Sequence, residues 1–182
     1  MVILRDWRLE DLDVYAHWMA PGHRWQDFDG PYFPKPTPEE QAQELERRRA
    51  AILAGSWPEP RSRLVVADAA TDAMLGTVSW YWLGKETNWL ALGILIFDAN
   101  HWGRGLGAAA MRQWCDYLWS AMPQLARLDL ETWSGNPGMM RLAEKLGFKL
   151  EARYRKARVV DGVYHDALGY GVLREEWAGA AQ

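Results

Sequence analysis

Three glycines that fall within five positions, Gly103, Gly105 and Gly107, mark the segment most suited to binding a ligand. Because glycine has no Cβ atom, a charged group can approach the backbone closely there. The apolar run 92–97 before the segment is typical of a buried strand, and the run 108–114 after it is typical of a helix start. The first amides of a helix have no acceptor within it, and its dipole adds positive potential beside them. This arrangement predicts a diphosphate site, and the alternative is a turn that binds nothing.

Two common phosphate-binding motifs do not fit this segment. A P-loop would end in Gly-Lys-Ser or Gly-Lys-Thr, which does not follow these glycines. A nicotinamide fingerprint needs an acidic residue about 20 positions further on, at the end of a second parallel strand. Asp129 and Glu131 lie somewhat beyond that distance, and the glycines stand mid-chain rather than after a first strand. A Rossmann domain is therefore not expected.

Hydrophobic periodicity predicts the elements that position the glycines. Strands are expected over residues 2–8, 64–68, 75–83, 89–97, 126–132, 148–159 and 164–173. Helices are expected over residues 10–19, 39–54, 105–120 and 137–146, with an irregular proline-rich loop over 20–38. No repeat or linker divides the chain, so we expect one domain over residues 1–178 and a short tail over 179–182. The order of elements predicts an α/β fold with a central mixed sheet and helices on both of its faces.

Composition and charge argue against several classes of protein. Of the 182 residues, 49% are hydrophobic and 25% charged, which is ordinary for a globular domain. A net charge of −3 argues against nucleic acid as a partner. We expect no membrane partner, because the sequence has no apolar run of transmembrane length and no signal peptide. A single cysteine, Cys115, suits the cytoplasm, and four scattered histidines suggest no metal site.

The stretch Phe97-Asp98-Ala99-Asn100-His101-Trp102-Gly103-Arg104-Gly105-Leu106-Gly107 resembles the coenzyme A loop of the GNAT acetyltransferase superfamily. It departs from the family pattern at Ala99, where proline is usual, and at Trp102, where Gln or Arg is usual. The Trp-Gly-x-Gly version is found in the branch that contains the ribosomal-protein N-acetyltransferases. Three further segments resemble that branch in the same order: residues 4–12, Asn136 followed by 142–148, and 169–177. The resemblance therefore extends over nearly the whole chain.

The resemblance implies a fold, a reaction and a co-substrate. The fold is a twisted, mostly antiparallel sheet of about seven strands, with helices on both faces and one pair of strands that splays apart at the coenzyme site. The implied reaction is transfer of an acetyl group from acetyl-CoA to a primary amine, by direct attack on the thioester and without a metal. The pantetheine arm of the coenzyme would enter the gap between the splayed strands and pair with their free backbone groups.

The resemblance also implies which residues bind the coenzyme. The backbone of Leu95, Ile96 and Phe97 would pair with pantetheine, and an amide there could stabilise the oxygen of the reacting thioester. Asn136 would contact the pantetheine or an ordered water, and the alternative is that it caps the following helix. The diphosphate would be held by Gly103, Arg104, Gly105, Leu106, Gly107 and Ala108. For Arg104 the alternative is a side chain that faces solvent.

Glu131 corresponds to the glutamate that accepts a proton from the amine in related enzymes, and a carboxylate beside an apolar pocket would make a useful base. The alternative is a strand-end carboxylate that binds a cation or solvent. The tyrosine and serine that protonate the departing thiolate in relatives correspond here to Ala143 and Met139. Water could then supply this proton, or a nearby side chain among Tyr81, Tyr154 and His101 could do so.

The acceptor amine stays open between a protein N-terminus and a small molecule such as an antibiotic, a polyamine or an amino-acid derivative. A coenzyme A-binding sensor without catalysis is a third hypothesis. The loop 20–38 would form much of the acceptor site, where Asp27 and Asp29 suit a cationic acceptor. Aromatic faces also attract cations, although core packing is the commoner role of tryptophan. The tryptophans nearest the expected site are Trp80, Trp82, Trp89 and Trp102. A monomer and a homodimer are equally compatible with the sequence.

Overall fold

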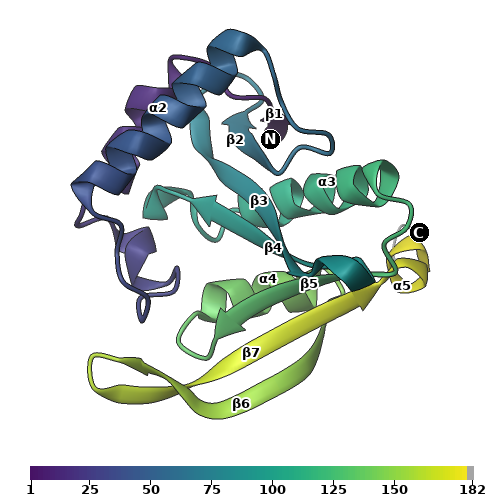
Figure 1. Ribbon diagram of the computed structural model, residues 1–182. Coiled ribbons are helices and arrows are strands. Elements are labelled where there is room, and N and C mark those ends of the chain that lie inside the picture. The colour runs from purple at the N-terminus through teal and green to yellow at the C-terminus, as the bar shows by residue number, and fades with distance from the viewer. Residues whose placement is uncertain (180–182) are drawn as a thin grey trace.

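The computed structural model describes residues 1–179 and contains one mixed sheet with helices packed around it (Figure 1). The strands are β1 (Val2–Arg5), β2 (Arg63–Asp68), β3 (Met74–Gly84), β4 (Trp89–Ile96), β5 (Arg127–Trp133), β6 (Lys149–Val160) and β7 (Val163–Leu173). The α-helices are α1 (Asp11–Met19), α2 (Pro38–Ala54), α3 (Leu106–Ala121), α4 (Pro137–Lys145) and α5 (Arg174–Gly179). Of the predicted tail, Gly179 ends α5 and residues 180–182 lie outside the described residues.

The strands form a sheet in the order β1-β2-β3-β4-β5-β7-β6. Each neighbouring pair is antiparallel except β4 with β5, which run parallel because α3 connects them. Figure 1 shows β6 and β7 as a long hairpin at the bottom of the view, far from α2 at the upper left. This arrangement confirms the predicted fold class of a mostly antiparallel seven-stranded sheet.

Alternating residues of the sheet fill two separate cores. Leu64 and Val66 of β2 pack into the larger core, which contains buried side chains of α3 such as Trp114. Their neighbours Val65 and Ala67 face the other way and pack into a smaller core with side chains of α1 and α2. The sheet therefore has helices on both faces, as predicted. Within residues 1–179, no helix is both long and apolar enough to cross a lipid bilayer.

Local sequence explains where α2 begins. Thr37 caps α2: its hydroxyl accepts a hydrogen bond from the Glu40 amide at 3.2 Å, and the Glu40 carboxylate accepts one from the Thr37 amide at 2.8 Å. Pro38 then occupies the first helical position, where its missing N–H costs nothing. Cys115 is buried in α3, and burial raises the pKa of its thiol, which argues against a role as a nucleophile.

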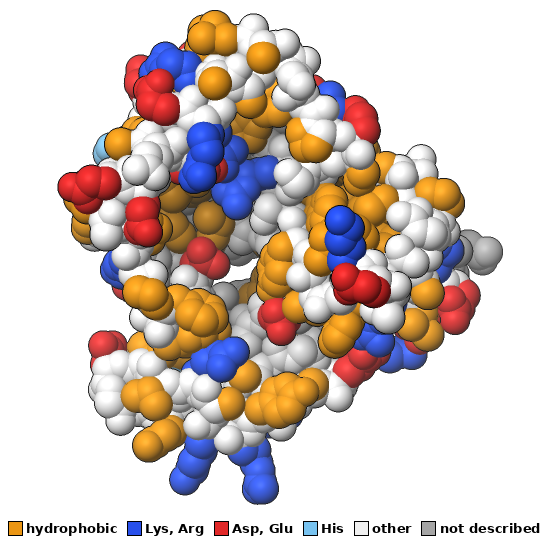
Figure 2. Space-filling view, in the orientation of Figure 1, with side chains coloured by type: hydrophobic (Ala, Val, Ile, Leu, Met, Phe, Trp, Pro, Cys, Tyr) orange, Lys and Arg blue, Asp and Glu red, His pale blue; other side chains and the backbone are white. Residues whose placement is uncertain are grey.

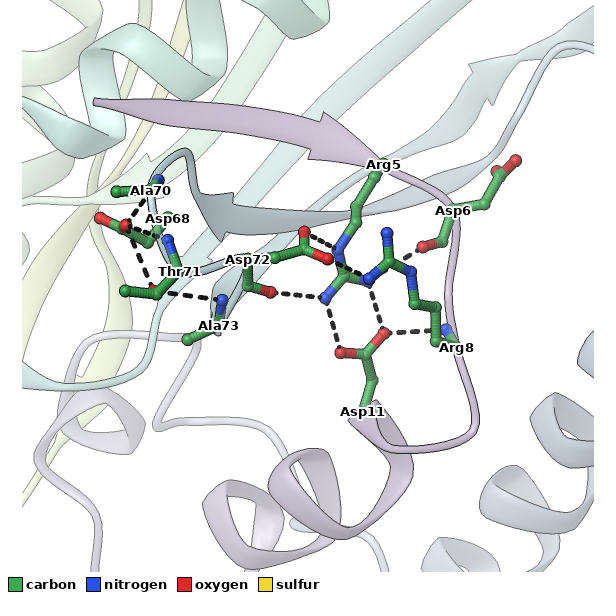
Figure 3. A network of polar contacts seen from close by, with 9 residues as sticks. All are labelled: Arg5, Asp6, Arg8, Asp11, Asp68, Ala70, Thr71, Asp72 and Ala73. Atoms are coloured by element: carbon green, nitrogen blue, oxygen red, sulfur yellow. Dashed lines mark hydrogen bonds and ion pairs between the residues drawn. The ribbon is translucent and has the colours of Figure 1, made fainter.

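The first strand is shorter than predicted because its end joins a cluster of charges, Arg5, Arg8, Asp11 and Asp72, which we call the N-terminal charge cluster (Figure 3). The guanidinium of Arg5 donates to the two carboxylate oxygens of Asp11 at 2.7 and 2.9 Å and to Asp72 at 2.8 Å. The backbone amide of Arg8 donates to Asp11 at 2.8 Å, and the Arg8 side chain pairs with Asp72. These bonds tie the end of β1 to the start of α1 and to the turn between β2 and β3.

Candidate active site

A large cleft of about 1690 Å³ opens on the side of the sheet that α1 and α2 leave partly uncovered. Figure 2 shows this face of the molecule hollowed between the part that carries α2 and the β6–β7 hairpin. The cleft is lined by the loop before α2, by β3, β4, β5, β6 and β7, by the first turn of α3 and by one face of α4. It therefore brings together segments that lie more than 100 positions apart in the sequence.

Strands β4 and β5 separate inside this cleft. Their ladder consists of two pairs, Ala91 with Asp129 and Leu92 with Leu130. On its other side β4 stays paired with β3 as far as Ile96. The later residues of β4 therefore have backbone groups that no residue of β5 pairs with, and the predicted splaying of these two strands is confirmed.

The antiparallel pairing with β3 decides which backbone groups of β4 face the gap. The amide of Phe97 donates to the carbonyl of Leu75 at 3.0 Å, so by alternation Leu95 also directs its backbone toward β3. Ile94 and Ile96 direct theirs toward the gap, and the Ile96 carbonyl accepts from the Trp102 indole at 2.8 Å. Of the three residues predicted to pair with pantetheine, only Ile96 is so oriented. Leu95 and Phe97 are not, and Ile94, which sequence reasoning missed, is.

The glycine segment forms a tight turn into α3. Gly103 has φ +74° and Gly105 has φ +80°, a left-handed conformation that glycine adopts without strain. Gly105 caps the helix without a side chain, and the first helical bond runs from the Ala109 amide to the Gly105 carbonyl at 3.0 Å. The three amides before Ala109 thus have no acceptor within the helix. The residues of this segment that line the cleft are Gly103, Gly105, Leu106, Gly107 and Ala108.

The cationic side chains that line the cleft near this turn do not include Arg104, the one predicted to contact the diphosphate. Arg104 is exposed and does not line the cleft, which agrees with its alternative as a solvent-facing residue. Arg141 and Lys145, four positions apart on one face of α4, line the cleft instead. Arg24 also lines it, with its guanidinium 5.6 Å from the ring centre of Trp102. The spacing of the two α4 cations was the signal that could have identified them from sequence.

Asn136 lines the cleft but uses its side chain for structure. Its carboxamide oxygen accepts from the Met139 amide at 3.0 Å, which caps α4. Its amide nitrogen donates to the carbonyl of Phe28 at 3.3 Å, and the indole of Trp133 donates to the same carbonyl at 2.9 Å. The structure thus places Asn136 in the capping role that was the alternative, and it also anchors the loop before α2.

Glu131 lies on β5 and is exposed to the cleft, so it is not in an apolar pocket. The hydroxyl of Tyr81, on β3, donates to its carboxylate at 2.7 Å. Burial, together with the hydrogen bond and the charge of Glu131, raises the pKa of Tyr81 well above its ordinary value. The phenol therefore stays protonated and acts as a hydrogen-bond donor.

The residues considered as proton donors and the tryptophans expected near the site lie on both faces of the sheet. Ala143 is buried within α4, whereas Tyr154 and His101 line the cleft. Trp80 and Trp82 pack against the larger core on the opposite face. They cannot form part of an acceptor pocket, whereas Trp89 and Trp102 line the cleft.

The loop before α2 covers part of the cleft and carries a carboxylate into it. Asp29 lines the cleft, and burial raises its pKa while the charge of Arg63 partly opposes that shift. Asp27, also predicted, lies on the loop outside the lining. Tyr32 of the same loop contacts the β6–β7 hairpin, where the guanidinium of Arg158 lies 4.7 Å from its ring centre. Within residues 1–179, no group of three or more His, Cys, Asp or Glu side chains could hold a metal ion.

Comparison with known sequences agrees with the motifs. The family model of the acetyltransferase (GNAT) domain matches residues 1–149. Over 108 residues the chain is 32% identical to a Bacillus subtilis (strain 168) protein named "Probable N-acetyltransferase YjcK", a match that covers 59% of this chain and 59% of that protein. A match to YdaF of the same organism is 29% identical over 99 residues and covers 46% of that protein. The chain thus spans about half the length of these relatives.

Solved structures share the fold across the whole chain. Spermidine N-acetyltransferase from Vibrio cholerae, in complex with CoA and spermine, has a TM-score of 0.75 at 18% identity, covering 97% of this chain and 98% of that one. A GNAT-family acetyltransferase from Bacillus anthracis has a TM-score of 0.73 at 15% identity, covering 96% of each chain. At such identity the likeness is one of fold. Together with the family model, which matches most of the chain, it leads to one assignment: this protein belongs to the GNAT acetyltransferase family.

Proposed function

We propose that the protein is an N-acetyltransferase that uses acetyl-CoA and acetylates a primary amine by direct attack on the thioester, without a metal. The observation that supports this most is that three features line one cleft: the glycine turn into α3, the gap between β4 and β5, and the carboxylate of Glu131. Each feature suits one part of the reaction, namely the diphosphate, the pantetheine arm and the amine.

The chain's own groups would bind the coenzyme in two places. The free amides at the start of α3, with Arg141 and Lys145, supply donors and positive charge for the diphosphate. The gap-facing backbone groups of Ile94 and Ile96 supply partners for the amides of pantetheine. The Ile94 amide is the first amide beyond the last β4–β5 pair that faces the gap, and it is suited to stabilise the oxygen of the tetrahedral intermediate.

The chemical step then needs a group that takes a proton from the amine. In our proposal Glu131 accepts a proton from the ammonium, directly or through a water, and the neutral amine attacks the thioester carbon. A C–N bond forms, the C–S bond breaks, and the coenzyme leaves as a thiolate that takes a proton from solvent. Since a thiolate is a fairly good leaving group, the missing acid at Ala143 need not prevent turnover.

For the acceptor we propose a small cationic amine. The loop before α2 contacts the β6–β7 hairpin through Tyr32 and Arg158, which narrows the acceptor end of the cleft. Asp29 and the aromatic side chains there suit an ammonium group. The structural neighbour from V. cholerae is named a spermidine N-acetyltransferase, which agrees with this class. The Trp-Gly-x-Gly segment favours a protein N-terminus as the second candidate. We further propose that the protein acts in the cytoplasm, as a monomer or a homodimer.

The test combines coenzyme binding with an acceptor screen. Calorimetry with coenzyme A should show saturable binding. Thiol release from acetyl-CoA should then be measured with diamines, polyamines, aminoglycosides, amino-acid amides and short peptides with free N-termini. We expect release with a small cationic amine and slower release with peptides. Absence of coenzyme binding would overturn the proposal, whereas binding without turnover on any amine would indicate a sensor.

A further inference from the structure

Tyr81 reaches Glu131 across an intervening strand. Tyr81 on β3 is paired with Ala91 on β4, and Ala91 is paired with Asp129 on β5. On the cleft side of β4, Ala91 carries only a methyl group and Gly93 carries no side chain. The tyrosine ring therefore has room to cross β4, and its hydroxyl lies 2.7 Å from the Glu131 carboxylate.

The contact spans the point where the strands separate. The last β4–β5 pair joins Leu92 and Leu130, and Glu131 is the next residue of β5. The pair of side chains therefore lies at the inner end of the gap that would admit the pantetheine arm. A reacting thioester held by the free backbone of β4 would lie beside it.

A second carboxylate on the same face of β5 provides a contrast. Asp129 is buried, and its oxygens accept from the Arg127 guanidinium at 2.7 and 3.0 Å and from the Trp89 indole at 2.9 Å. Within the described part of the chain, Glu131 accepts a hydrogen bond from Tyr81 alone. One oxygen of Glu131 is thus oriented by protein while the other stays open to the cleft.

We propose that Tyr81 is a positioning residue for the transfer reaction, whose hydroxyl holds one oxygen of Glu131 and aims the other at the amine. This inference rests on the proposed function. The raised pKa of Tyr81 is consistent with a hydroxyl that donates throughout the working range and does not itself exchange its proton.

The kinetic test is a double-mutant cycle. Tyr81→Phe removes the hydroxyl and should lower kcat about tenfold, as expected for one hydrogen bond to a charged group, while KM for acetyl-CoA stays unchanged. In a Glu131→Gln background the same change should have little further effect. Tyr164→Phe, at an exposed tyrosine of the hairpin outside the cleft, is the matched control and should leave kcat unchanged. Equal losses in both backgrounds would overturn the inference.

A structural comparison decides the inference even if the protein does not turn over. Crystal structures of the parent protein and of Tyr81→Phe should show one orientation of the Glu131 carboxylate in the parent, and a rotated or disordered carboxylate in the variant. The other charged groups of this part of the cleft, Asp29, Arg63 and Asp129 with Arg127, are the same in both proteins. An unchanged orientation of Glu131 would overturn the inference, whereas missing turnover with a changed orientation would overturn the proposed function alone.

Discussion

The N-terminal charge cluster and the glycine turn before α3 are both rich in polar groups, but they differ in how far these groups are paired. In the cluster, Asp11 is 2% exposed and accepts three hydrogen bonds, from Arg5 and from the Arg8 amide (Figure 3). In the turn, the first amides of α3 have no acceptor within the helix, and the turn lines a cleft. A buried polar group without a partner is costly, so pairing is complete where the role is structural. Open donors in a cleft indicate a place for a ligand.

The largest expected effect comes from removing a partner in the N-terminal charge cluster, where the polar groups are paired. Asp11→Ala leaves the Arg5 guanidinium, whose pKa is raised by its hydrogen bond to Asp11, without its main partner. We expect a loss of about 3–5 kcal/mol in the free energy of unfolding, because the variant loses both bonds from Arg5 and the bond from the Arg8 amide, and the Arg5 guanidinium keeps only the partly exposed Asp72 as an ion-pair partner. Denaturant unfolding measures it. Asp13→Ala, at an exposed position in the same helical turn, should change stability by less than about 0.5 kcal/mol. Similar losses for both would show that the burial and pairing of Asp11 do not set the size of the effect.

A second prediction concerns Glu131, the cleft carboxylate with one oxygen held by Tyr81. Glu131→Gln should lower kcat about a hundredfold or more, because the amine loses its proton acceptor, while calorimetry should find coenzyme affinity unchanged. Glu86→Gln, at an exposed turn residue outside the cleft, serves as the control. An unchanged kcat in Glu131→Gln would contradict the role of Glu131 as the proton acceptor.

A smaller effect should follow from filling the open donor site. Gly105→Val places a branched side chain where the diphosphate would approach the backbone, and we expect at least a tenfold loss of coenzyme affinity, or about 1.4 kcal/mol. A Cβ at Gly105 meets no atom within 4 Å, so the folded protein has room for it, but its φ of +80° adds strain. Gly55→Val shares this strain, with φ +57° and open space, at the end of α2. Only the Gly105 variant should lose affinity in calorimetry, and an equal loss in both would point to strain instead.

The smallest effect tests the edge of the charge cluster through pH. Burial pushes the pKa of Asp72 upward, but the hydrogen bonds and charges of Arg5 and Arg8 outweigh it, so the net pKa is lowered. Such a carboxylate stabilises the fold above the ordinary aspartate value of about 3.9, and this contribution is lost as the pH falls through the folded-state pKa. Asp72→Asn should therefore unfold at lower urea than the parent at neutral pH, and the two midpoints should converge in acid. A difference in urea midpoint that stays constant with pH would show that the charge of Asp72 does not stabilise the fold.

Features encoded in short stretches of sequence were predictable. The helix predicted over 39–54, the glycine turn and the buried strand before it occur in the structure close to where the sequence placed them. Each depends on contacts among neighbours in the chain, so the residues themselves carry the information. The first strand was too long in prediction because the partner that ends it, Asp72, lies 67 positions from Arg5.

Features that depend on the register between strands were not predictable in the same way. Alternation along β3 separates Trp80 and Trp82 from Tyr81, but it does not say which face the helices cover. The sequence also does not say whether Ile94 or Leu95 directs its backbone groups toward the gap, because that follows from the pairing of β4 with β3.

The sequence alone determined the family, the order of elements and the glycine turn before α3, because these follow from local spacing and residue type. Only the tertiary structure decided that Tyr81 meets Glu131 and that Asn136 and Trp133 hold the loop at Phe28. Those contacts join residues 50 to 108 positions apart. They exist because the packing of helices on both faces sets the register and separation of the strands, which no short segment specifies by itself.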